Sequence, residues 1–127
     1  MSDWKPEGYR SVSPYLIVSD AKATLEFLRV VFGAAPLRVH PRPDGTLMHA
    51  EARIDDTVVM LADATDGWPA VPAHVHVYVP DVDASYRRAL DAGAAAVMEP
   101  AQKDDKDKRG GVQDPGGTTW WLATQRG

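Results

Sequence analysis

The amino-acid sequence predicts an α+β fold in which two copies of a βαβββ module follow one another along the chain. The first observation is that Val18–Thr24 matches Val79–Ser85 at an offset of 61 residues. The second is that Thr57–Ala62 matches Thr118–Ala123 at the same offset. Because a shared offset at both ends of a unit is difficult to obtain by chance, we infer an internal repeat, which indicates repeated structural units.

The composition is the third observation, because it is that of one compact domain. The chain has 127 residues, of which 44% are hydrophobic and 25% are charged, and these values are typical of a globular protein with a single core. We therefore place one domain over residues 1–127, with module one at about residues 12–63, a linker at about 64–73 and module two at about 74–124.

The first half begins with a strand and a helix. Pro14–Ser19 is apolar and β-branched, which is typical of a strand, and Asp20 can cap the helix that follows. The helix should end just before Gly33, which suits the left-handed conformation past a helix end. Its buried face should hold residues at helical spacing, namely Leu25, Leu28 and Phe32.

Three strands complete the first half, and we expect them at residues 37–40, 47–54 and 57–62. The stretch Arg42–Gly45 has proline and glycine where a tight turn favours them, so it should lead into the second of these strands. Asp55 and Asp56 should form the turn before the third.

The second half repeats this order, beginning with a strand at residues 74–79. Asp81 or Asp83 can cap the next helix, and Gly93 closes it. The buried face of this helix should consist of Val82, Tyr86, Ala89 and Leu90.

The remaining strands and connections follow from turn residues and charge. Strands are expected near residues 95–99 and 109–113, and Asp114–Gly117 should turn the chain into the last strand. Asp63–Ala73 is rich in alanine, aspartate and proline, which predicts a linker across the surface. The charged stretch 103–109 lacks apolar residues, so we expect a mobile, solvated loop or a flap over a site.

Charge and residue counts exclude several classes of protein. The formal net charge is −4 and the basic residues are scattered, which disfavours nucleic acid as a partner. The chain has no cysteine, which excludes disulfides, cysteine nucleophiles and thiolate metal sites. No apolar run is long enough to span a membrane and the start of the chain has no secretory signal pattern, so we expect a cytoplasmic protein.

Three stretches carry a resemblance to a known family: VSDAKATLEFL followed by VFGA, RPDGTLMHAEARI, and GGVQDPGGTTWWLAT. They resemble the vicinal oxygen chelate superfamily, which contains glyoxalase I, extradiol dioxygenases and bleomycin resistance proteins, and most of all its PhnB-like branch. The resemblance covers the chain from about residue 12 to 124. It implies a cup-shaped mixed sheet with the helices outside, a dimer, and a site within the cup.

The resemblance also locates four positions that we call the stations. Metal-dependent members hold ligands on the first and last strands of each module, and these positions fall on Ser13, Met60, His74 and Trp121. Indole nitrogen is only a donor, a thioether binds hard cations poorly and a neutral hydroxyl is a weak ligand. Because only His74 suits a metal, we predict no metal and no cofactor.

Strand alternation places His74, His76 and Tyr78 on one face. Three interpretations of this face stay open: structural hydrogen bonds, contact with a ligand, and metal ligation. Alternation in the last strand likewise turns Trp121 towards the cup, where it can plug the cavity or stack on a planar ligand. Trp68 lies in the linker, where it can close over the mouth of the cup or pack on the surface.

Residues 48–54 place His49, Glu51 and Arg53 on one side of a strand. His49 and Glu51 can form a general base with its orienting partner, or a polar pair that faces solvent in an ion network with Arg53. A metal site of His49, Glu51 and His74 is a further option, which requires their two strands to be neighbours.

The first hypothesis for function is a metal-free protein that sequesters an aromatic or peptide-like natural product, in the manner of bleomycin resistance proteins and hence of antibiotic resistance. The alternative is a glyoxalase-like lyase or isomerase, or a dioxygenase-type enzyme, with a non-standard metal or general-base site at His49, Glu51 and His74. A third hypothesis is a dimeric scaffold or regulator. We expect a homodimer, and the predicted ligand-binding residues are Trp121, Met60, His74, His76, Tyr78, Ser13, His49, Glu51 and Trp68.

Overall fold

The computed structural model describes residues 3–126 and contains the two predicted modules. Module one consists of β1 (Tyr15–Val18), α1 (Ala21–Phe32), β2 (Ala35–Pro41), β3 (Leu47–Ile54) and β4 (Thr57–Asp63). Module two consists of β5 (Ala73–Tyr78), α2 (Val82–Asp91), β6 (Ala95–Gln102), β7 (Asp107–Gln113) and β8 (Thr118–Gln125). The α+β class and the tandem βαβββ order are therefore confirmed.

Each module forms one four-stranded mixed sheet. The strand orders are β1-β4-β3-β2 and β5-β8-β7-β6, and the first strand of each module pairs in parallel with the last. Tyr15 lies opposite Met60 in the first sheet, and His76 lies opposite Trp121 in the second. Tyr15 and His76 are 61 residues apart, and so are Met60 and Trp121. The predicted repeat is therefore also present in the register of the two sheets.

The two helices begin at equivalent aspartates. Asp20 and Asp81 each accept a hydrogen bond from the backbone N–H three residues later, at 3.0 and 3.2 Å, so Asp81 rather than Asp83 caps α2. Such a bond satisfies one of the amide groups that a helix start leaves without a partner. Gly33 follows α1 in the left-handed conformation, with φ 66°.

A second equivalent pair ties each helix to the last strand of its own module. The carboxylate of Asp63 accepts hydrogen bonds from the backbone N–H of Ala21 at 2.7 Å and of Leu47 at 2.6 Å. In module two the hydroxyl of Thr124 accepts from Val82 N–H at 2.9 Å and donates to the carbonyl of Val79 at 2.7 Å. The same joint is thus built from a carboxylate in one module and a hydroxyl in the other.

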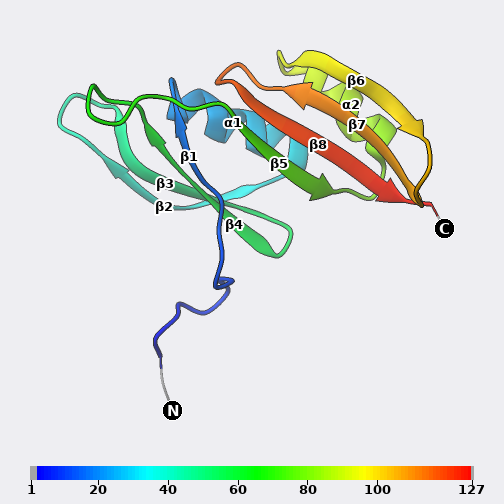
Figure 1. The fold of residues 1–127 in the computed structure, drawn as a ribbon. Coiled ribbons are helices and arrows are strands. Elements are labelled where there is room, and N and C mark those ends of the chain that lie inside the picture. The colour runs from blue at the N-terminus through cyan, green and yellow to red at the C-terminus, as the bar shows by residue number, and fades with distance from the viewer. Residues whose placement is uncertain (1–2, 127) are drawn as a thin grey trace.

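One hydrophobic core extends through both modules. The helices lie together on one side of the sheets (Figure 1), and Phe32 at the end of α1 contacts Trp120 of β8, with 5.5 Å between ring centroids. Leu25, Phe32 and Leu90, which were predicted to be core residues, are only partly buried. Phe27 and Val31 of α1 take fully buried places instead, because the helix presents a wider face than the predicted stripe.

Two connections differ from the expectation or refine it. The charged stretch 103–109 is not loop throughout, because β7 begins at Asp107 and only residues 103–106 lie between strands. The linker is exposed, as expected, and Val71 N–H donates to the carbonyl of Ile17 at 3.2 Å, so the linker runs along β1. Within residues 3–126 no helix is long and apolar enough to cross a membrane.

Candidate functional site

Strand residues that point away from the helices form two surfaces, which we call the first open face (on β1 to β4) and the second open face (on β5 to β8). Because side chains alternate along a strand, every second residue of each strand belongs to its open face. In β4 Val59 and Leu61 enter the core while Met60 does not, and in β8 Trp120 and Leu122 enter the core while Trp121 does not. The predicted orientation of Trp121 is therefore confirmed.

The second open face carries a flat aromatic surface. The indole N–H of Trp121 donates to Nδ1 of His74 at 3.1 Å, and the two ring planes differ by only 10°. Because an indole N–H lies in the plane of its ring, this hydrogen bond places the rings edge to edge. We call this pair the aromatic platform. His74 is exposed and Trp121 is half-buried, so the platform is open to a ligand.

A glycine on the neighbouring strand makes room for the platform. Gly111 lies opposite Trp121, and a Cβ at Gly111 would be 2.7 Å from Cζ3 of the indole. Such a distance is not compatible with an ordinary van der Waals contact, so the indole can lie flat against β7 only because residue 111 has no side chain.

A charged network borders the platform. Arg109 donates from Nε to Nε2 of His76 at 3.2 Å and pairs with Asp105 at 3.1 Å and Asp107 at 3.0 Å, while the Tyr78 hydroxyl donates to Asp107 at 2.6 Å. Desolvation and the Arg109 charge lower the pKa of His76, which suits a neutral imidazole that accepts from a guanidinium. A pocket of about 400 Å³ lies between this network and Trp121.

The first open face carries a buried carboxylate. Glu51 is 1% exposed and accepts hydrogen bonds from the Tyr9 hydroxyl and from Nε2 of His49, the latter at 2.7 Å. The other ring nitrogen of His49, Nδ1, lies 3.3 Å from the Tyr15 hydroxyl. We call Glu51, His49 and Tyr15 the relay.

Glu51 is held in its charged form by these partners. Burial raises the pKa of Glu51, but the hydrogen bonds from Tyr9 and His49 outweigh burial, and the net result is a pKa below the ordinary value. The same hydrogen bond to Glu51 raises the pKa of Tyr9. The predicted solvent-facing ion network with Arg53 is wrong, because Glu51 is buried and Arg53 instead donates to the carbonyl of Gly8 at 3.4 Å.

The remaining predicted site residues lie in two pockets beside the relay. Ser13 and Met60 line a pocket of about 470 Å³ together with Tyr9 and Arg38. Trp68 lines a second pocket of about 560 Å³ together with Tyr15, Ile17 and Met48. Trp68 is 70% exposed, so it forms a wall of that pocket without filling it.

The stations do not fit a metal ion. Ser13 and Met60 line a pocket beside the first open face, whereas His74 and Trp121 belong to the second open face, and Nδ1 of His74 already accepts from the indole N–H. The alternative set of His49, Glu51 and His74 does not form, because β3 and β5 belong to different sheets. Among the residues that the structure describes, no three histidine or acidic side chains are grouped to hold a metal.

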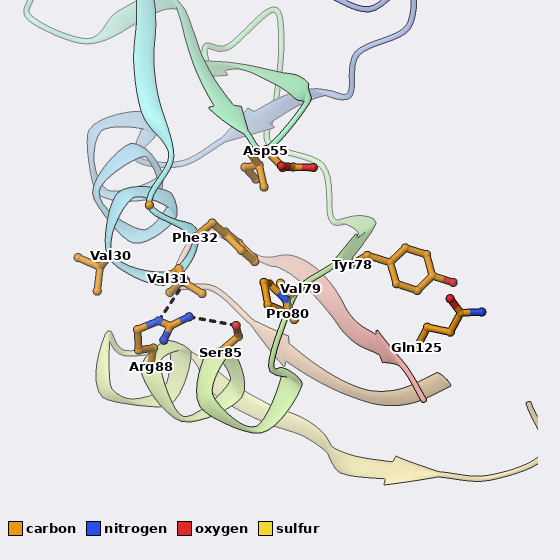
Figure 2. Close-up of a pocket in the computed structure, with 12 residues that line it drawn as sticks. Val30, Val31, Phe32, Asp55, Tyr78, Val79, Pro80, Ser85, Arg88 and Gln125 are labelled. Atoms are coloured by element: carbon orange, nitrogen blue, oxygen red, sulfur yellow. Dashed lines mark hydrogen bonds between the residues drawn. The ribbon is translucent and has the colours of Figure 1, made fainter. Parts of the chain in front are cut away.

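A groove of about 880 Å³ lies between the modules (Figure 2). Of the nine predicted site residues only Tyr78 lines it. Arg88 of α2 reaches across the groove to α1, where it donates to the carbonyl of Val31 at 3.2 Å. It also donates to Ser85 of its own helix at 3.0 Å. The groove therefore lies where the two helices meet, and the other eight predicted site residues do not line it.

Several residues of these networks were not singled out from the sequence, among them Tyr15, Tyr9, Arg109 and its partners Asp105 and Asp107. Tyr15 could have been found, because it precedes His76 by the repeat offset and shares the face of that residue. Arg109 lies in the stretch that was expected to be a mobile loop. Tyr9 precedes the first strand and bonds to a residue 42 positions later, so no local pattern indicates its role.

Comparison with known proteins identifies a family and relatives of this chain. A family model described as Glyoxalase/Bleomycin resistance protein/Dioxygenase superfamily matches residues 11–122. An uncharacterized protein of Mycobacterium bovis is 37% identical over 123 residues, and the match covers 88% of this chain and 81% of that protein.

Solved structures share the fold. TioX from Micromonospora sp. ML1 has a TM-score of 0.74 at 24% identity, over 91% of this chain and 99% of that chain. The PhnB protein from Bacillus cereus has a TM-score of 0.73 at 18% identity, over 91% and 99%. TnmS3, described as an antibiotic binding protein from Streptomyces sp. CB03234, has a TM-score of 0.70 at 20% identity, over 98% and 99%. At these identities the similarity concerns the fold alone.

Proposed function

The chain belongs to the glyoxalase/bleomycin resistance protein/dioxygenase superfamily, and from this membership we propose that it binds a planar aromatic small molecule on its open sheet faces. The observation that carries the proposal is the aromatic platform, in which the exposed His74 and the half-buried Trp121 lie nearly in one plane. A planar ligand stacked on such a surface gains about 0.5–1.5 kcal/mol beyond area burial.

Within this function, the ligand class we favour is an aromatic or peptide-like natural product that the protein sequesters. The description of TnmS3 as an antibiotic binding protein supports this choice, since the two chains share their fold over nearly their whole length. The likeness to the PhnB protein of Bacillus cereus supports placement in the PhnB-like branch. Arg109 and Asp107 beside the platform supply polar groups that would orient the ligand.

The aromatic platform makes a direct prediction for binding. Trp121→Ala should weaken the affinity for acridine or anthraquinone compounds about ten-fold, since a loss of about 1.4 kcal/mol corresponds to that factor. Isothermal titration calorimetry measures the change without depending on indole fluorescence. Trp4→Ala is the comparison variant, because Trp4 is 73% exposed and lines the pocket of Ser13 and Met60 instead of the platform, so it should keep the affinity if the ligand stacks on Trp121. No heat of binding from the unaltered protein across a broad aromatic panel would contradict the proposed function.

We also propose that the protein acts as a homodimer, because β2, β5 and β6 each have a strand neighbour on one side only in the part of the chain that the structure describes. The first strand of each module lies at a sheet edge, and the β5 residues Val75 and Val77 are only partly buried. Edge strands of this kind favour pairing with another chain. Light scattering at micromolar concentration should give twice the chain mass of 13.8 kDa. A mass that stays at 13.8 kDa as the concentration rises would refute the dimer.

A second candidate function is that of a lyase or isomerase that uses a general base without a metal. The observation that favours it is the hydrogen bond between His49 and the buried carboxylate of Glu51. A carboxylate in this position fixes the tautomer of the imidazole and stabilises the imidazolium that forms when the base accepts a proton.

A further inference from the structure

We propose that the relay of Glu51, His49 and Tyr15 transfers protons to and from a small molecule held in the pocket between Tyr15 and Trp68. This activity rests on the second candidate function, for which it names the residue that meets the substrate. It does not depend on the aromatic platform, because the relay and its pocket belong to the first open face and the linker. The substrate class is a planar or carbonyl compound with an acidic C–H bond, whose conjugate base carries negative charge on oxygen.

The hydrogen bonds of the relay run in one direction, from Tyr15 through His49 to Glu51. Glu51 is held as a carboxylate, so it accepts from Nε2 of His49 and that nitrogen carries the hydrogen. In the neutral imidazole on which the proposal rests, Nδ1 of His49 carries no hydrogen and accepts from the Tyr15 hydroxyl. The three groups have the order carboxylate, imidazole, hydroxyl, which is the order found in acid–base relays of hydrolases.

The relay connects the interior of the protein with solvent. Glu51 is 1% exposed, the side chain of His49 is 21% exposed and Tyr15 is 51% exposed, so the relay runs from the interior to the surface. Only Tyr15 of the three lines the adjacent pocket of about 560 Å³. Tyr15 is therefore the catalytic residue that meets the substrate, while His49 and Glu51 act through it as positioning residues.

The residues that line the pocket next to Tyr15 suit a flat substrate that develops negative charge. Its walls are apolar and aromatic on the sides of Met48, Ile17 and Trp68, which suits a flat substrate. Arg42 lines the pocket and donates to neutral acceptors, the Thr46 hydroxyl and the Asp63 carbonyl. Hydrogen bonds from Thr46 lower the pKa of the nearby Asp44, and the Arg42 charge also helps to lower it. An arginine with neutral partners remains available to stabilise an oxyanion that forms during the reaction.

The proton transfer balances without an oxidant or a second reactant. The substrate C–H proton passes to the Tyr15 oxygen while the Tyr15 proton passes to Nδ1 of His49, which gives an imidazolium beside the Glu51 carboxylate. The electron pair of the C–H bond remains on the substrate and its charge develops on oxygen near Arg42. An isomerisation ends when the same proton returns to a different atom, and an elimination ends when a leaving group departs.

The probe for this activity is 5-nitrobenzisoxazole. Loss of its C–H proton breaks the N–O bond, and the electron pair of that bond leaves on oxygen as a coloured nitrophenolate, which is followed by absorbance. The unaltered protein should accelerate this reaction above the buffer rate. Because a positioned acid or base contributes about 10²–10⁴-fold, Tyr15→Phe and His49→Gln should each lower kcat at least about ten-fold and leave KM nearly unchanged.

His40 provides the matched control. It lies on β2 opposite His49, with 6.2 Å between ring centroids, and its exposed imidazole is not part of the relay. His40→Gln should keep the rate of the unaltered protein. Tyr15→Phe tests the relay even where His49→Gln does not fold, because Tyr15 is half exposed and the phenyl ring is retained. A rate no higher than buffer, an unchanged rate in Tyr15→Phe, or an equal loss in His40→Gln would overturn the proposal.

Discussion

Replacing Trp120 with alanine is expected to lower the free energy of unfolding by about 3–5 kcal/mol, as for other large aromatic side chains removed from a core. Trp120 is 0% exposed and is the largest of the fully buried side chains. Its indole N–H donates to Asp114 at 2.9 Å, and its ring contacts Phe32 at the junction of the modules. The substitution therefore leaves a cavity at the junction and removes one donor from a buried carboxylate.

Urea denaturation followed by circular dichroism measures this change, at one fixed protein concentration. Trp4→Ala is the control, since a surface substitution should stay within about 0.5 kcal/mol, and Trp4 is 73% exposed. Trp120→Phe helps to separate the two effects, because it removes the hydrogen bond and keeps much of the ring volume. A loss below about 1 kcal/mol for Trp120→Ala would show that the junction does not contribute to stability as the packing indicates.

The sequence carries most of the fold because local signals agree with the repeat. Asp20 and Asp81 cap helices at equivalent positions, and β3 has the predicted limits because apolar and polar residues alternate along it. The limits of β2 and β6 were less predictable. Both are edge strands, mostly exposed on both faces and interrupted by prolines such as Pro36 and Pro100, so their strand pattern is weak.

The candidate site was predictable only in part. Alternation places His74 and Trp121 on one face, but the hydrogen bond between them depends on the parallel pairing of strands 47 positions apart. Glu51 was expected to have His49 as a polar partner, yet it is buried and has a second partner in Tyr9, which approaches from outside the sheets. Short-range patterns can assign a face to a residue, whereas contacts between distant segments decide whether that residue is exposed.

Asp63→Asn is expected to lower the free energy of unfolding by about 2–4 kcal/mol, because a buried donor without a partner costs about 1–3 kcal/mol and bonds to charged acceptors are the stronger ones. Asp63 is 7% exposed and its two carboxylate oxygens each accept one backbone N–H, from Ala21 and from Leu47. Asparagine has one carbonyl oxygen, so its NH₂ group would face one of these donors. The start of α1 and the start of β3 would no longer both be held.

Thr124 gives the comparison within the same chain that tests this explanation. It occupies the equivalent position in module two, but its neutral hydroxyl accepts only the N–H of Val82. Thr124→Val leaves the N–H of Val82 and the carbonyl of Val79 without this partner and should cost about 1–2 kcal/mol, less than Asp63→Asn, because only one backbone donor is lost to it. Asp56→Asn is the surface control, because its carboxylate is 60% exposed and pairs only with Arg10 and Thr57. If urea denaturation gives Thr124→Val the larger loss, the number of backbone donors held by the side chain is not what stabilises this joint.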